Sequence, residues 1–140
     1  MSDVCGVKVG DRAEYTRTVT MDDIQKFADV TGDANPLHSD AEYAKKTRFK
    51  EPIAHGMLSA GYISAVLGTK LCPDAVTIYL SQTLRFMRPV KVGDTIRAIA
   101  EVEGLEAEKR TLTLKTECFN QDGDAVVKGE AVVMLDPIRD

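Results

Sequence analysis

One apolar segment limits what this chain can fold into. It reads Gly-Met-Leu-Ser-Ala-Gly-Tyr-Ile-Ser-Ala-Val-Leu-Gly-Thr-Lys-Leu from Gly56 to Leu71, carries no charge before Lys70, and places apolar side chains on every side of a helical wheel. A helix that is apolar all round is normally buried. A helix of this length spans about 24 Å, which is close to the width of a small domain. We therefore expect a long central helix with the other elements wrapped around it.

The second half of the chain alternates between apolar and polar side chains. This period-two pattern covers residues 76–86, 95–102 and 112–118, and a valine-rich run over residues 124–135 follows a Gln-Asp-Gly turn. Such alternation is typical of strands with one face on a core. Short turns join the four segments, so we predict an antiparallel meander that ends in a hairpin. The predicted fold class is α+β, with a long buried central helix wrapped by a curved antiparallel sheet.

The first half of the chain predicts an edge strand followed by a capped helix. Residues 13–19 alternate in the manner of a half-exposed strand. Thr20 can cap the next helix, Asp23 can complete the cap three positions later, and Gly32 ends the helix. A short polar helix is expected over residues 40–47, and Pro52 then breaks the chain before the apolar segment.

The loop between these two helices carries a carboxylate and an imidazole. It reads Thr-Gly-Asp-Ala-Asn-Pro-Leu-His-Ser-Asp from Thr31 to Asp40. Its glycine, asparagine and proline disfavour helical geometry, so Asp33 and His38 are held on an irregular segment. Such a pair is suited to acid/base chemistry. Taken alone, however, the same loop is an ordinary turn. The other motifs of the chain are needed to decide between a turn and an acid/base site.

Composition narrows the class of protein. The 140 residues fit a single domain, residues 1–140, that can bury a core without disulfides or metals. With 18 basic and 22 acidic residues the net charge is −4, which argues against a nucleic-acid or anionic-membrane binder. Three widely spaced cysteines outside any C-x-x-C pattern indicate thiols in a reducing compartment, and we expect the cytoplasm. The sequence shows no signal-peptide pattern and no apolar run approaching the roughly 20 residues of a membrane span.

Three motifs, in this order and spacing, resemble the MaoC-like family and especially its single-domain (R)-specific enoyl-CoA hydratases. They are Gly-Asp-Ala-Asn-Pro-Leu-His-Ser-Asp at residues 32–40, Pro-Ile-Ala-His-Gly-Met-Leu at 52–58 and Phe-Met-Arg-Pro-Val-Lys-Val-Gly-Asp at 86–94. The resemblance implies a hot-dog fold and a homodimer whose two sheets join into one. It also implies reversible hydration of trans-2-enoyl-CoA, such as crotonyl-CoA, to (R)-3-hydroxyacyl-CoA. No metal and no separate cofactor are implied, because coenzyme A is part of the acyl-CoA substrate.

The resemblance also assigns roles to residues of the first two motifs. Asp33 and His38 match the catalytic positions, and we expect both to hold the same water. Which of the two is the base stays open, because coupled groups share their titration. Asn35 is expected to orient the loop or the thioester. Gly56 begins the central helix, so its N–H, at the positive end of the helix dipole, is expected to face the thioester oxygen.

Several other residues have more than one interpretation. Ser64 matches an acyl-pocket position and Leu67 is expected on the same face, although a helical serine commonly bonds back to a carbonyl one turn earlier. His55 either caps the start of the helix or binds nearby. Local positive charge is needed for the phosphates of coenzyme A, and the sequence does not choose among Lys45, Lys46, Arg48, Lys50, Arg85, Arg88 and Lys91.

Alternative activities exist on the same fold. A 3-hydroxyacyl substrate carried on an acyl carrier protein is a close variant. Hot-dog thioesterases commonly place a carboxylate on or beside the central helix, yet residues 56–71 contain no Asp or Glu. A non-catalytic acyl-thioester-binding subunit is expected to have lost Asp33 or His38, and this chain keeps both. We also expect a preference for short acyl chains, because the residues around Ser64 give no sign of a long tunnel.

Overall fold

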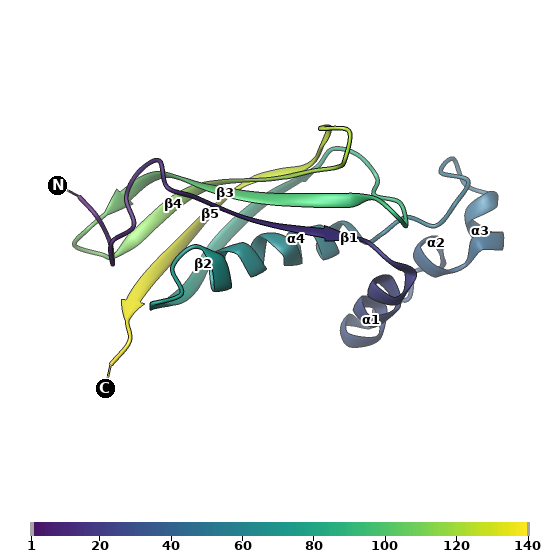
Figure 1. Ribbon diagram of the computed structural model, residues 1–140. Helices are drawn as coiled ribbons and strands as arrows, with labels where there is room; N and C mark the ends of the chain where they lie inside the picture. Colours follow the sequence, from purple (N-terminus) through teal and green to yellow (C-terminus); the bar gives the residue numbers. More distant parts are fainter. Residues whose placement is uncertain (1, 140) are drawn as a thin grey trace.

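An antiparallel sheet of five strands lies over one long helix, and further helices gather beyond one end of it (Figure 1). This computed structural model describes residues 2–139. The strands are β1 (Arg12–Thr18), β2 (Ala75–Phe86), β3 (Thr95–Glu106), β4 (Thr111–Phe119) and β5 (Ala125–Pro137). The predicted α+β class, with an antiparallel sheet around a central helix, is confirmed.

The predicted meander of four strands is wrong in one respect. The order in the sheet is β1-β3-β4-β5-β2, so only β3, β4 and β5 follow one another as neighbours. β2 pairs with β5 in antiparallel register and forms an edge of the sheet. The segment that leaves β2 contains Pro89 and Gly93 and leads to the interior of the sheet, where β3 lies between β1 and β4. Alternation along a strand defines its two faces, but it does not identify its neighbours.

The central helix is present, but one face of it is exposed. Helix α4 (Gly56–Ala65) continues directly into the π-helical segment η1 (Val66–Lys70), which matches the predicted length closely. The expectation of burial all round is wrong for a single chain, because the sheet covers only one side of the helix. The exposed stripe consists of Met57, Gly61, Ser64 and Gly68.

The core lies between the central helix and the sheet. On β3 and β4 the core side chains fall at every second position, as the alternation predicts: Ile96, Ala98, Ala100, Val102, Leu112, Leu114, Thr116 and Cys118. Ile99, out of this alternation, is also buried. The edge strand β2 differs, because Val76, Leu80 and Phe86 are 48%, 52% and 51% exposed. Together with the exposed stripe of α4, this edge offers apolar surface to water.

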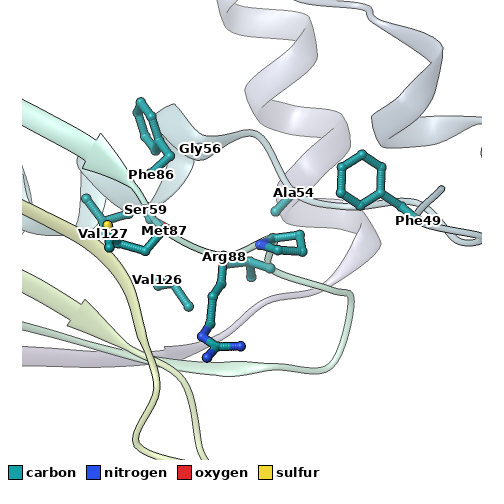
Figure 2. Close-up of a pocket in the computed structure, with 11 residues that line it drawn as sticks. Phe49, Ala54, Gly56, Ser59, Phe86, Met87, Arg88, Val126 and Val127 are labelled. Atoms are coloured by element: carbon teal, nitrogen blue, oxygen red, sulfur yellow. The ribbon is translucent and has the colours of Figure 1, made fainter. Parts of the chain in front are cut away.

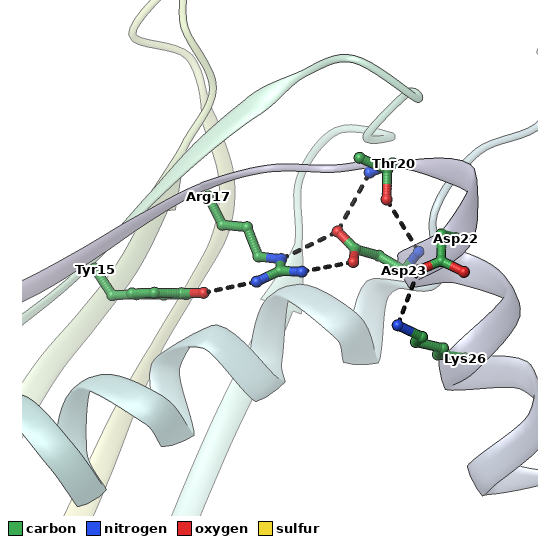
Figure 3. Close-up of polar contacts among 6 residues, drawn as sticks. All are labelled: Tyr15, Arg17, Thr20, Asp22, Asp23 and Lys26. Atoms are coloured by element: carbon green, nitrogen blue, oxygen red, sulfur yellow. Dashed lines mark hydrogen bonds and ion pairs between the residues drawn. The ribbon is translucent and has the colours of Figure 1, made fainter.

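Polar contacts fix the point where β1 ends and α1 (Met21–Thr31) begins (Figure 3). The Thr20 hydroxyl accepts a hydrogen bond from the N–H of Asp23 at 3.1 Å, and the Asp23 carboxylate accepts one from the N–H of Thr20 at 3.3 Å. This is the predicted capping box. Arg17 on β1 donates to both carboxylate oxygens of Asp23, at 3.0 and 2.6 Å. These bonds lower the pKa of Asp23, raise the pKa of Arg17 and join the strand to the helix.

Two short helices complete the region beyond α1. Gly32 ends α1 in the left-handed conformation, with φ of 81°, as predicted. α2 (Pro36–Ser39) follows, so His38 lies on a short helix, and the expectation of an irregular segment is wrong for this residue because Pro36 starts a helix at its first position. Asp40 caps α3 (Ala41–Lys45), so the predicted polar helix is confirmed in a slightly shorter form. Within residues 2–139, none of the helices has both the length and the apolar character needed to cross a membrane.

Candidate active site

The loop between α1 and α2 is held in shape by its own polar groups. The Asp33 carboxylate accepts a hydrogen bond from the N–H of Asn35 at 3.3 Å, and the Asn35 side chain accepts one from the N–H of Leu37 at 3.1 Å. Asn35 therefore caps α2, and Pro36 occupies the first helical position. This geometry suits a loop-orienting role for Asn35. The Asp33 side chain remains about half exposed to solvent.

Three side chains from two segments meet beside this loop. One carboxylate oxygen of Asp33 and one ring nitrogen each of His38 and His55 all lie within 4.8 Å of one another. Two groups bound to the same water stand about 4.5 Å apart when each hydrogen bond is about 2.8 Å long and the angle is tetrahedral. Asp33 and His38 are therefore close enough to share one water.

The short segment from Ile53 to His55 contacts both members of this pair. Nδ1 of His38 bonds to the Ile53 carbonyl at 2.6 Å, and Nε2 of His55 bonds to the backbone carbonyl of Asp33 at 2.9 Å. A carbonyl oxygen only accepts, so each of these ring nitrogens carries the hydrogen and donates it. In its neutral form His38 therefore has its lone pair on Nε2, where it can accept a proton.

This segment is in turn tied to the turn that precedes β3. Ile53 forms a β-bridge with Lys91, and the N–H of Ala54 donates to the Val90 carbonyl at 2.7 Å. Val90 and Lys91 belong to the third sequence motif, at residues 86–94. The three motifs, which are far apart in the chain, thus form one hydrogen-bonded unit.

His55 has a larger part in this unit than the sequence indicated. Its side chain is 2% exposed, and its ring stacks on His38 with centroids 3.8 Å apart and an interplanar angle of 29°. Phe27 of α1 packs against the same ring at 4.6 Å. His55 occupies the N-cap position of α4, as one of its two interpretations expects, and its carbonyl accepts a hydrogen bond from the N–H of Leu58 at 3.0 Å, but its side chain makes no capping bond. Its place in the second motif was the only signal, because a lone histidine 22 residues after Asp33 predicts no contact with it.

Gly56 starts α4 next to this cluster. The first N–H groups of a helix have no partner within the helix and lie at the positive end of its dipole. A Cβ atom at this position would lie 2.6 Å from Cδ1 of Phe86, so a side chain here would displace the Phe86 ring. Glycine therefore allows the Phe86 ring to pack closely against the backbone at the helix start.

A cavity of about 260 Å³ adjoins the start of α4 (Figure 2). Gly56, Phe86 and Met87 line it, and so does Arg88, whereas Asp33 and His38 do not. Among the basic residues considered for the coenzyme A phosphates, Arg88 is the one that lines this cavity.

Ser64 and Leu67 lie in different surroundings. Ser64 lines a second cavity, of about 460 Å³, between α4 and β2, together with Met57, Tyr79 and Leu80. Leu67 is 1% exposed and belongs to the core. The expectation that the two share a face is wrong, because the sheet covers Leu67 and leaves Ser64 exposed.

A carboxylate and two imidazoles are also a possible donor set for a divalent metal ion. The lone pair of an imidazole lies in the plane of its ring, and the rings of His38 and His55 are stacked. In addition, Nδ1 of His55 is buried without a hydrogen-bond partner among the described residues. Coordination of a metal by Nε2 of His55 would require breaking its bond to the Asp33 carbonyl.

The sheet, the central helix and the hydrogen-bonded unit of the three motifs define a MaoC-like hot-dog domain. Comparison with known proteins agrees. Residues 7–122 match the family model described as the MaoC like domain. The chain belongs to this family.

Similar proteins match nearly the whole chain. An (R)-specific enoyl-CoA hydratase from Rhodospirillum rubrum is 47% identical over 129 residues, which cover 92% of this chain and 88% of that protein. The unliganded structure of an R-hydratase from Pseudomonas aeruginosa has a TM-score of 0.87 and 49% identity, covering 94% of this chain and 84% of that one. The structure of an (R)-hydratase from A. caviae, involved in PHA biosynthesis, has a TM-score of 0.89 and 42% identity, and the match covers 93% of this chain and 98% of that one.

Proposed function

We propose that this chain is an (R)-specific enoyl-CoA hydratase, which adds water reversibly to trans-2-enoyl-CoA to give (R)-3-hydroxyacyl-CoA. The observation that carries the proposal is that Asp33 and His38 approach within 4.8 Å beside the N-terminus of α4. The similarity to hydratases over nearly the whole chain supports the same substrate class. The proposed reaction uses no metal, and coenzyme A enters only as part of the substrate.

The reaction requires a base, an acid and a donor for an oxyanion. The base takes a proton from water as the water oxygen bonds to the β-carbon, and the acid returns a proton to the α-carbon. In the proposed site, the Asp33 carboxylate and Nε2 of His38 hold the water, and this pair transfers the proton that the water loses to the α-carbon. Only water and the alkene are consumed. The N–H of Gly56 donates to the thioester oxygen, which gains negative charge in the enolate intermediate.

An assay with two readouts separates hydration from the alternative activities. Purified protein is mixed with crotonyl-CoA, and the conjugated enoyl absorbance and the free thiol are followed together. Loss of absorbance without thiol release supports the hydratase, thiol release supports a thioesterase, and no change supports a binding subunit. We expect Asp33→Asn and His38→Gln each to lower kcat by about 100-fold. Asp29→Asn, on the neighbouring helix, is the matched control, and near-normal turnover in either site variant would contradict the assignment.

We infer that the acyl chain occupies the cavity that Ser64 lines, between α4 and β2. Its apolar walls, Tyr79 and Leu80 among them, suit a hydrocarbon chain, and a short chain is the expected preference. Rates on four-, six- and eight-carbon enoyl-CoAs test this preference. The same substrates carried on an acyl carrier protein test the alternative carrier.

We further propose that two copies of the chain pair along β2. This edge strand exposes Val76, Leu80 and Phe86, and it borders the exposed stripe of α4 through the Ser64 cavity. An unpaired apolar edge is normally covered by another chain or element. Sedimentation should show a dimer for the wild type and a monomer for Leu80→Lys. A monomeric wild type would refute the pairing.

We place the reaction in a reducing compartment, the cytoplasm. The support is that Cys5, Cys72 and Cys118 are all free thiols. Localisation of the tagged full chain in cells of its source tests this placement.

A further inference from the structure

We propose that His55 is a positioning residue, which fixes the distance between the Asp33 loop and the His38 ring and thereby sets kcat. This inference rests on the proposed hydration, because it names the residue that keeps the water-binding pair assembled. The proposal stands on four contacts of one buried ring.

The first two contacts join His55 to Asp33. Nε2 of His55 donates to the backbone carbonyl of Asp33 at 2.9 Å, and the same nitrogen lies 4.0 Å from a carboxylate oxygen of Asp33. Asp33 follows Gly32, whose backbone is in the left-handed conformation, and the Asp33 side chain is about half exposed. The bond from His55 is therefore an anchor for the loop from the protein interior.

The other two contacts fix the ring itself. It stacks on His38 at 3.8 Å and packs against Phe27 at 4.6 Å, and its side chain is 2% exposed. His38 is held at its other side by the Ile53 carbonyl, two residues before His55. His38 is thus bonded to this short segment, and His55 belongs to it. A displacement of the segment therefore moves His38 and the Asp33 loop together.

The tautomers follow from these bonds. His55 carries its hydrogen on Nε2, and its Nδ1 is buried without a partner among the described residues. His38 carries its hydrogen on Nδ1. A proton on Nδ1 of His55 would be buried without an acceptor, which is costly. His55 therefore suits a role in alignment rather than in proton transfer.

Two substitutions separate the contributions of the ring and the donor. His55→Phe keeps a ring to stack on His38 but removes the donor, whereas His55→Gln keeps an N–H donor near the position of Nε2. Misplacing a reacting group by about 1 Å can cost 100-fold in rate. We expect kcat to fall at least about 10-fold in His55→Phe with KM within about 2-fold of wild type, and His55→Gln to recover part of the loss. Tyr62→Phe is the matched control, because Tyr62 is a buried ring of α4 whose hydroxyl has no hydrogen-bond partner within residues 2–139.

A double-mutant comparison distinguishes positioning from general damage. If His55 acts through Asp33, His55→Phe should cost less than about 3-fold in kcat when Asp33 is already Asn, because coupled residues are not additive. An equal fold-loss in both backgrounds would overturn the proposal, and so would a fully active His55→Phe variant.

Imidazole NMR provides a readout that does not depend on activity. The chain has only 2 histidines, so the spectra of the labelled protein are simple to assign with His55→Phe. We expect one ring protonated at Nδ1, from His38, and one at Nε2, from His55. Two rings of the same tautomer would overturn the positioning role. A wild type that shows the two tautomers but does not hydrate crotonyl-CoA would instead refute the proposed function and leave the ring geometry intact.

Discussion

Gly56→Ala tests the start of the central helix, where Phe86 packs and where we place the thioester oxygen. The added Cβ would stand 2.6 Å from Cδ1 and 2.7 Å from Cε1 of the Phe86 ring. Carbon atoms in contact lie about 3.5–4.0 Å apart, so the ring must retreat by about 1 Å. Because Phe86 is 51% exposed, its ring can turn toward solvent, and we expect a loss of only about 1 kcal/mol in the free energy of unfolding.

The effect on activity should be much larger than the effect on stability. The methyl group stands beside the N–H that we assign to the thioester oxygen, and losing one oxyanion donor costs about 100-fold or more in kcat. We expect kcat on crotonyl-CoA to fall by about that factor, with urea denaturation reporting the small loss of stability in parallel.

A second substitution separates the two effects. Phe86→Ala in the Gly56→Ala background removes the clash, so the stability cost of the methyl group should disappear relative to Phe86→Ala alone. Activity should not return, because the methyl group still blocks the approach to the backbone. Recovery of activity in the double variant would show that the displaced ring caused the loss, and it would refute the claim that glycine is needed for close approach to this N–H.

Other parts of the structure lead to further expectations. Asp23→Asn should lower the free energy of unfolding by about 1–2 kcal/mol through loss of the capping box and the bonds to Arg17. Those bonds lower the pKa of Asp23 in the folded state. The stabilisation by Asp23 is therefore fully present above the ordinary carboxyl pKa of about 4 and is lost as pH falls through the folded-state pKa. The melting curves of variant and wild type should then converge in acid. Gly129→Ala should destabilise by about 3 kcal/mol in urea, because a Cβ would lie 1.9 Å from the Thr83 carbonyl oxygen on the paired strand; an unchanged midpoint would contradict this register. A thiol reagent should label Cys5 rapidly in the native protein and the two buried cysteines only after unfolding, and equal rates would refute their burial. Prolonged treatment with EDTA should leave hydration unchanged, whereas loss and recovery with added zinc would assign a metal to the site.

Local signals in the sequence were sufficient for the elements that surround the site. The capping pattern of Thr20 and Asp23 and the left-handed stop at Gly32 are satisfied by contacts within a few residues, so a sequence pattern can report them. The same holds for the Asn35 cap that shapes the loop. These local rules place Asp33 on the loop, but they did not predict the short helix that carries His38.

Local sequence patterns did not predict how elements that are far apart in the chain contact one another. The wheel of residues 56–71 shows that the helix is apolar, but it cannot tell a face covered by the sheet from the face exposed on a single chain, where Ser64 lies. Alternation along β2 likewise fails to show that its neighbour is β5. The contact of His55 with Asp33 depends on how the second motif docks on the third, and no spacing rule describes that docking.

The order of strands has a consequence for how the protein reaches its native state. β3, β4 and β5 are joined by hairpins and can assemble early, whereas Thr18 of β1 pairs with Thr95 of β3 across all the intervening helices, and β2 must find β5. Closing such large loops is slow. The bend that carries the proposed site lies between β1 and β2 in the sequence, so during refolding enzymatic turnover should reappear only after most of the secondary structure has returned.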